Sequence, residues 1–144
     1  MQYIMDIKDE PHERPTQGTN GDYPEISFTF ISNTIEGLMG IKPDATNNKI
    51  ITASHLTSDI DWLEVTQLPV GKHEITVRHD GVKQTTFTND STLPLLWEAW
   101  FYGDYTSLIV DGQSVTATKK LVNGQTVSFV QISVSSEETR VVQK

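Results

Sequence analysis

Two patterns of hydrophobic residues divide the sequence near residue 41. Between residues 22 and 40, apolar positions recur every three or four residues, which predicts a helix. From residue 49 onwards, short segments rich in Val, Ile, Thr and aromatic residues alternate with period two, which predicts strands. The sequence therefore predicts one helix followed by a region of strands.

The ends of the predicted helix carry recognisable signals. Asp22 is placed as the N-cap, Pro24 lies in the first turn, Glu25 completes a capping box, and Gly40 stands at the far end. Residues 26–30 also alternate, so a strand is the alternative there. The apolar side of the predicted helix consists of Phe28, Ile31, Ile35, Leu38 and Met39.

The strand region contains nine segments separated by turn signals. Asx-Gly pairs at 80–81, 111–112 and 123–124 are typical of tight turns and predict hairpins. Residues 41–48 are expected to form a connector. The predicted fold class is mainly β, an antiparallel β-sandwich of about eight short strands preceded by an N-terminal loop and one helix. The segments are 49–54, 62–68, 73–79, 82–88, 95–102, 108–111, 114–121, 126–134 and 139–142.

Composition narrows the possible functions. The 144 residues include 11 Lys and Arg against 19 Asp and Glu, a net charge of −8, and no Cys. The absence of Cys from the sequence excludes disulfides and thiolate chemistry. The scattered basic residues argue against nucleic-acid binding. The sequence predicts a soluble globular chain with no transmembrane segment, signal peptide or cofactor, and it leaves the localisation open.

The most aromatic segment is 95–102. As a strand it places Trp97 on one face and Trp100 with Tyr102 on the other, which is typical of a strand covered on both sides or offering one face to a partner. Trp97, Trp100 and Tyr102 are candidates for a sugar-binding platform, because pyranose rings stack on exposed aromatic rings. The alternative is that these rings, with Trp62 and Phe129, fill the sandwich core or an interdomain seam.

No specific catalytic pattern is visible in the sequence. The four histidines are expected at the surface or rim, and Asp59 with Asp61 is interpreted as a solvated turn rather than a calcium site, so no metal site is predicted. Glu13, between prolines and glycines, is a candidate catalytic carboxylate; the alternative is a simple loop charge.

Residues 35–45 read Ile-Glu-Gly-Leu-Met-Gly-Ile-Lys-Pro-Asp-Ala. This stretch resembles a junction in bacterial glycoside hydrolases of the six-hairpin, or (α/α)6-barrel, type, similar to glycogen-debranching and trehalase-like glucosidases. In that family, an E-G-L-hydrophobic-G-hydrophobic-x-P-D motif ends the last barrel helix and a C-terminal β-domain follows. Residues 68–77 and 109–113 also resemble hairpins of that domain.

The resemblance implies that the chain is the C-terminal part of a larger enzyme, because 144 residues cannot hold the twelve helices of such a barrel. Residues 1–41 would be a remnant of the barrel, and residues 42–144 would be the β-sandwich. Glu13 would match the family's general base, with Glu25 as a rival, and the acid would lie in the missing barrel. The implied function is a non-catalytic accessory domain supporting carbohydrate degradation; the alternative is an independent carbohydrate-binding or adhesion-type module.

The resemblance also implies partners. The missing barrel would cover a group of apolar residues on the predicted helix, and carbohydrate is a further expected partner. Without the barrel, these residues are expected to dock on the sandwich, mediate a dimer or stay mobile. They are Phe28, Phe30, Ile31 and Ile35.

Overall fold

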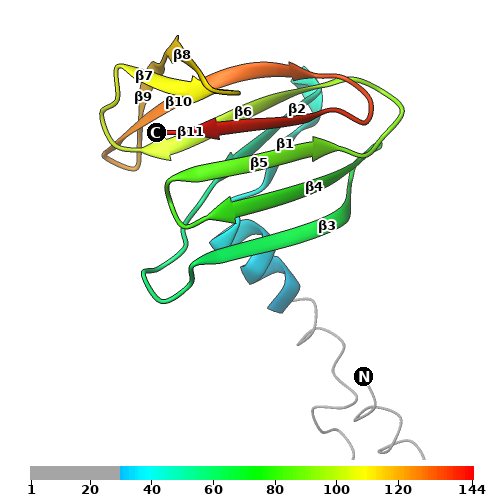
Figure 1. Cartoon of the computed structure of the whole chain (residues 1–144). Coiled ribbons are helices and arrows are strands. Elements are labelled where there is room, and N and C mark those ends of the chain that lie inside the picture. Colours follow the sequence, from blue (N-terminus) through cyan, green and yellow to red (C-terminus); the bar gives the residue numbers. More distant parts are fainter. Residues whose placement is uncertain (1–29) are drawn as a thin grey trace, which may run out of the picture. The chain divides into compact units, whose positions relative to one another are not determined.

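A computed structural model describes residues 30–144 (Figure 1). The chain divides into two units, residues 1–35 and residues 36–144. Residues 30–32 are α-helical and continue into the π-helix η3 (Asn33–Leu38). The predicted helix is thus confirmed over 30–38, while its proposed start at Asp22 lies outside the described residues. The division into 1–41 and 42–144 stays a prediction.

Residues 36–144 form two β-sheets. Five strands make one sheet in the order β1-β2-β6-β10-β9, and six make the other in the order β3-β4-β5-β11-β7-β8. A short 3-10 helix, η4 (Ala45–Asn47), joins β1 to β2. The strands are β1 (Lys42–Asp44), β2 (Lys49–Ala53), β3 (Trp62–Val70), β4 (His73–Asp80), β5 (Gln84–Asn89), β6 (Leu95–Tyr102), β7 (Ser107–Val110), β8 (Gln113–Thr116), β9 (Thr118–Val122), β10 (Gln125–Val134) and β11 (Thr139–Gln143).

The mainly β, sandwich-like fold is confirmed, with three departures from the predicted pattern. The connector contains strand β1, which pairs with β2. The segment 114–121 is two strands in different sheets, broken at Ala117, whose N–H donates to the carbonyl of Thr106. Strands β2 and β6 pair in parallel, so the fold is not purely antiparallel.

The three Asx-Gly hairpins are confirmed at β4–β5, β7–β8 and β9–β10. In the last two turns both central residues have positive φ: Asp111 at 49° with Gly112 at 85°, and Asn123 at 50° with Gly124 at 79°. This is the backbone conformation that matches the twist of the flanking strands, which explains why Asx-Gly pairs occur there.

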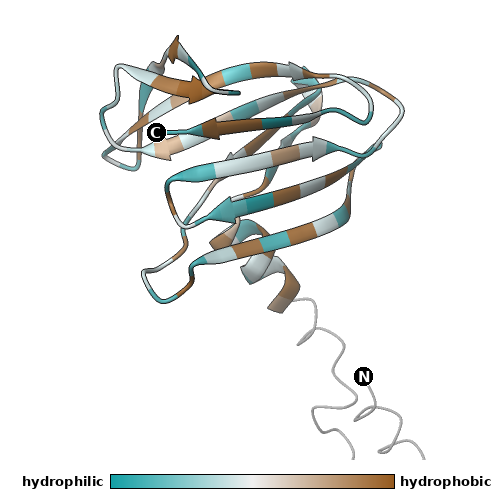
Figure 2. Cartoon of the chain, viewed as in Figure 1, coloured by the Kyte–Doolittle hydropathy of each residue, from teal (hydrophilic) through white to brown (hydrophobic). Residues whose placement is uncertain are grey.

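Apolar side chains between the two sheets form the core. Along β4, inward residues are buried and outward ones are half-buried, and Figure 2 shows the hydropathy alternating along the strands. Phe87 of β5 and Trp97 of β6 are both fully buried and stack with centroids 4.9 Å apart and an interplanar angle of 15°. This pair joins the two sheets at the centre of the sandwich. Within residues 30–144, no helix has the length and apolar character needed to span a membrane.

The segment that follows η3 is fixed to the β unit. Met39 and Ile41 are 0% and 2% exposed. Between them, Gly40 has φ +57°, and a Cβ at this position would lie 2.1 Å from the carbonyl oxygen of Ala53. Two hydrogen bonds hold the residues just before the glycine, because Leu38 O accepts from His55 N–H and Met39 O accepts from His79 Nε2. Only glycine fits this position without displacing β2.

We expect Gly40→Ala to lower the free energy of unfolding by about 3 kcal/mol, since it adds a backbone clash to the cost of positive φ. Gly71→Ala is the matched control. Gly71 has φ +61° with nothing within 4 Å of the added Cβ, so this variant should lose only the cost of a positive φ, about 1 kcal/mol. Urea unfolding of both variants measures the difference. Equal losses would contradict the proposed contact with Ala53.

Candidate functional site

Strand β6 holds the three aromatic residues of the predicted sugar platform, but its two faces have different surroundings. Trp97 points into the core, where its Nε1 donates to Thr52 Oγ1 over 2.9 Å and its ring stacks on Phe87. Because Trp97 is 0% exposed, it offers no surface to a ligand in this structure. This ring therefore fills the core, as the alternative interpretation of the aromatic residues expected.

Trp100 lies on the outer face of the five-stranded sheet and is 9% exposed. It packs with Ala53 and Val127, and the Lys120 ammonium lies 4.0 Å from its ring centroid. Phe129 is its neighbour on β10, 4.4 Å from the same ammonium. The outer face therefore has a small apolar cluster of its own, covered by a cation over the aromatic faces.

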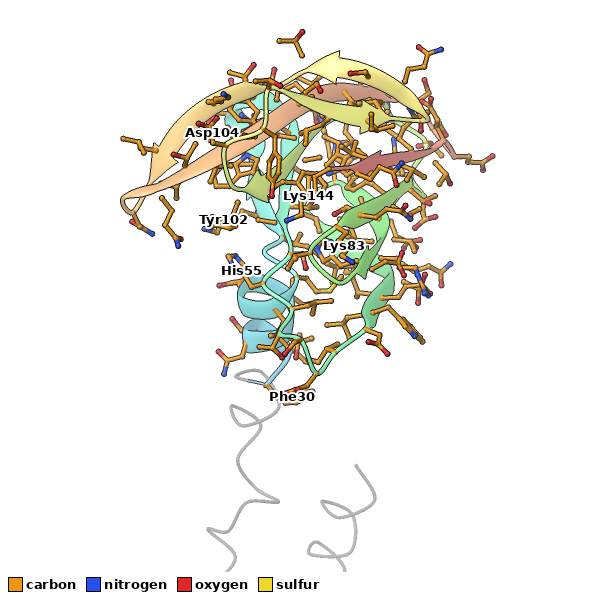
Figure 3. The ribbon with its side chains drawn as sticks, turned by 60° about the vertical axis from the view of Figure 1, so that its left-hand side comes forward. Phe30, His55, Lys83, Tyr102, Asp104 and Lys144 are labelled. Carbon is orange, nitrogen blue, oxygen red and sulfur yellow. The ribbon has the colours of Figure 1, made fainter. Side chains whose placement is uncertain are left out.

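Tyr102, at the end of β6, is the most accessible of the three rings. Its centroid lies 5.2 Å from that of His55 at an interplanar angle of 50°, so the two rings are tilted rather than coplanar (Figure 3). A small hollow of about 130 Å³ lies beside the Tyr102 ring. It is lined by Ser54, Val82, Trp100, Phe101, Tyr102 and Lys144.

Glu98 lies between Trp97 and Trp100 in sequence and is the central polar group of the outer face. It is 1% exposed, and four donors occupy its two oxygens. Burial alone would raise the pKa of Glu98, but these hydrogen bonds lower it to about 2. Oε1 accepts from Trp100 Nε1 at 2.6 Å and Lys120 Nζ at 2.9 Å; Oε2 accepts from Gln131 Nε2 at 2.7 Å and Lys49 Nζ at 2.9 Å.

This network is suited to holding the sheet together rather than to proton transfer. A carboxyl group with a pKa near 2 is ionised at neutral pH and is a weak base, so it fits neither role of a general acid or base well. Its donors come from β2, β6, β9 and β10, so the charge links four strands. We define Glu98 with these four partners as the Glu98 network.

Two histidines are more buried than the sequence predicted, whereas His55 is exposed as expected and His12 lies outside the described residues. His79 is 0% exposed; its Nε2 contacts the carbonyl of Met39 and its Nδ1 contacts Thr85 Oγ1, each at 2.8 Å. Because a carbonyl only accepts, Nε2 carries the proton and Nδ1 accepts from the hydroxyl. His73 is 7% exposed and contacts Asn48 and Ser91. The prediction of a surface or rim position is wrong for both histidines. Each ring nitrogen has a hydrogen-bond partner, so the imidazoles can be buried without losing polar contacts.

The remaining predicted site residues lie apart from one another. Asp59 is exposed, and Asp61 lines a hollow of about 530 Å³ between the 56–61 loop and the β4–β5 turn. Among the described residues, no group of three or more His, Cys, Asp or Glu side chains is arranged to hold a metal ion. Glu13 and its rival Glu25 lie outside the described residues.

The β-rich unit has a third hollow of about 310 Å³, where β1 and β2 approach the β3–β4 turn. Its lining is mostly apolar, and the nearly buried His73 forms part of it. The other lining residues are Pro43, Asp44, Ala45, Asn48, Lys49, Ile50, Val70, Gly71 and Lys72.

The alternative interpretation of the aromatic residues placed Trp62 in the core or in an interdomain seam, but Trp62 is 54% exposed at the start of the edge strand β3. The Arg78 guanidinium lies 4.3 Å from its ring centroid. Alternation along residues 62–68 indicates a half-exposed strand, and register with β4 decides which face is exposed. The alternation of residues 62–68 alone therefore did not predict whether Trp62 is exposed or buried.

Comparisons with protein-family models, curated proteins and solved structures found no match to this chain.

Glu98→Gln is expected to lower the free energy of unfolding by about 2 kcal/mol at neutral pH, because both lysines lose a charged acceptor. Since the folded pKa of Glu98 is lowered, its stabilisation is complete above about pH 4.5 and declines as the pH falls towards about 2. Urea unfolding across this range should show the two proteins converging in stability. Glu74→Gln, on the outer side of β4, is the control; an equal effect there would contradict a special role for the Glu98 network.

Burial lowers the pKa of His79, against an opposing contribution from its hydrogen bond to Met39. We therefore expect its imidazole proton NMR signal, assigned by its loss in His79→Gln, to titrate below the ordinary value of 6.5. Because the unfolded chain binds this proton first, the contribution to stability is complete above about pH 6.5 and is lost as the pH falls through the folded pKa. A midpoint at or above 6.5 would contradict the assignment of a neutral buried ring.

Proposed function

We propose that the chain is the non-catalytic C-terminal β-domain of a larger glycoside hydrolase, where it supports an (α/α)6 catalytic barrel in carbohydrate degradation. The observation that carries the proposal is the conformation of the junction. Residues 35–45 resemble the family's junction, and within them Met39, Gly40 and Ile41 are held by the β unit. A helix that ends at such a junction must leave the β-domain in one fixed direction. The close packing of the Gly40 backbone against Ala53, which leaves no room for a Cβ, would hold the chain in that direction.

The proposed role of the domain is mechanical. The hydrogen bonds from His55 to Leu38 and from His79 to Met39 fix the backbone on both sides of η3's end, so a preceding helix would be anchored at its last turn. Interfaces between domains of one chain bury about 600 to 1,500 Å². A barrel seated on the β-domain would cover the exposed apolar residues Phe30, at 72%, and Ile31, at 53%.

The chemistry of hydrolysis is assigned to the barrel. Inverting hydrolysis needs an acid and a base about 6.5 to 9.5 Å apart on opposite sides of the sugar. Glu98, the buried acid of the β unit, has all its acceptor sites occupied and a pKa of about 2. Glu13 remains the proposed general base of the parent enzyme, with its acid in the barrel.

The test is the mass of the native protein in source cells, detected with an antibody raised against this chain. We expect a species several times larger than 16.1 kDa. We also expect the purified 144-residue chain to leave nitrophenyl glucosides and rhamnosides unhydrolysed, because it would lack the catalytic acid. A native species of 16 kDa, or turnover by the purified chain, would refute the proposal.

A further inference from the structure

The outer face of the six-stranded sheet carries an exposed indole held by a braced cation. Arg78 of β4 stacks on Trp62, and its own position is fixed by Asp80, whose Oδ1 accepts from Nη2 at 2.9 Å and from Nε at 3.1 Å. The ring is thus held by a side chain that is itself ion-paired, while 54% of Trp62 stays open to solvent. An exposed aromatic ring that is already ordered loses little conformational entropy when a ligand binds to it.

Strand register places a row of polar side chains beside this ring. Trp62 is opposite Asp80, which is opposite Gln84 on β5. Residues directly opposite one another share a sheet face, and neighbouring strands lie about 4.8 Å apart. By the same register, Glu64 is opposite Arg78. This part of the face therefore presents the Asp80 and Glu64 carboxylates as acceptors together with the Gln84 amide, whose Nε2 donates to Asp80 Oδ2 over 3.5 Å.

We propose that this surface binds a neutral oligosaccharide of pyranose units. We define it as the Trp62 face: Trp62, Glu64, Arg78, Asp80 and Gln84. The C–H side of one sugar ring would stack on the electron-rich indole, and the hydroxyls of that unit and the next would bond Asp80, Gln84 and Glu64.

Charge favours a neutral ligand over an acidic one. The whole chain has a net charge of −8, and the guanidinium of Arg78 is already paired with Asp80. An anionic sugar would therefore meet an acidic surface whose nearest cation is occupied. Hydroxyl groups carry no such penalty and can both donate and accept.

The Trp62 face also continues towards space for more than one sugar unit. Asp80 belongs to it and lines the 530 Å³ hollow as well, together with Asp61 and Lys83. Ile60 and Val82 contribute apolar surface there, beside the hydroxyls of Thr57 and Ser58. A mixed polar and apolar lining of this kind is complementary to the alternating hydroxyl and C–H surfaces of a glycan.

This site lies wholly within residues 36–144 and does not require a preceding barrel. Its test is therefore separate from the mass measurement, and either proposal can fail while the other stands.

The experiment titrates the full 144-residue chain with maltohexaose, cellohexaose and xylohexaose, followed by calorimetry and by tryptophan emission. Trp97 and Trp100 are 0% and 9% exposed, so acrylamide quenching reports mainly on Trp62. We expect at least one hexaose to bind and to protect Trp62 from quenching. Trp62→Ala should weaken that binding at least about tenfold, whereas Trp62→Phe, which keeps an aromatic face, should weaken it less.

Leu121→Ala is the control, because Leu121 is 74% exposed on β9 of the other sheet and should leave binding unchanged. Failure of all three hexaoses to bind at millimolar concentration would overturn the proposal. Binding that survives Trp62→Ala would also overturn it, by placing the glycan elsewhere. Protection of Trp62 from acrylamide quenching in the absence of sugar, if it is lost on dilution, would also overturn the proposal. It would show that a second protein molecule covers the indole.

Discussion

The structure of the β unit depends on strand β6 being covered on both faces. On the inner face, Trp97 stacks on Phe87 and so joins the two sheets. On the outer face, Glu98 is buried beneath lysines from β2 and β9. A carboxylate in this position is tolerated only because four donors replace its water. The strand thus combines an aromatic contact and an ionic contact within two adjacent residues.

Local sequence signals predicted most of the fold. The Asx-Gly turns and period-two segments located the three tight hairpins and nearly every strand, because hairpins depend on residues close in sequence. Strand β1 was missed since Lys42-Pro43-Asp44 has no apolar alternation, and its pairing with β2 is set by the turn η4. The parallel pairing of β2 and β6 joins residues that are 47 positions apart in the sequence, and hydrophobic periodicity carries no information on such distant pairing.

The candidate sites were harder to predict because they also depend on contacts between residues far apart in the sequence. The donors to Glu98 include Lys49, Lys120 and Gln131, at separations of 49, 22 and 33 residues, so the network exists only once four strands are aligned. The sequence correctly put Trp100 and Tyr102 on the face opposite Trp97, but burial of an outer face by lysine stems is a tertiary effect. The exposure of Trp62 likewise follows from its place on an edge strand.

The position of β11 has a consequence for how the β unit forms. This strand comes last in the sequence yet lies between β5 and β7, inside the six-stranded sheet. Until residues 139–143 are in place, the β3-β4-β5 meander and the β7–β8 hairpin have no hydrogen-bonded connection within that sheet. Because the two parts of this sheet are joined only when β11 pairs with both β5 and β7, folding is expected to be slow, as is typical of topologies dominated by long-range pairing.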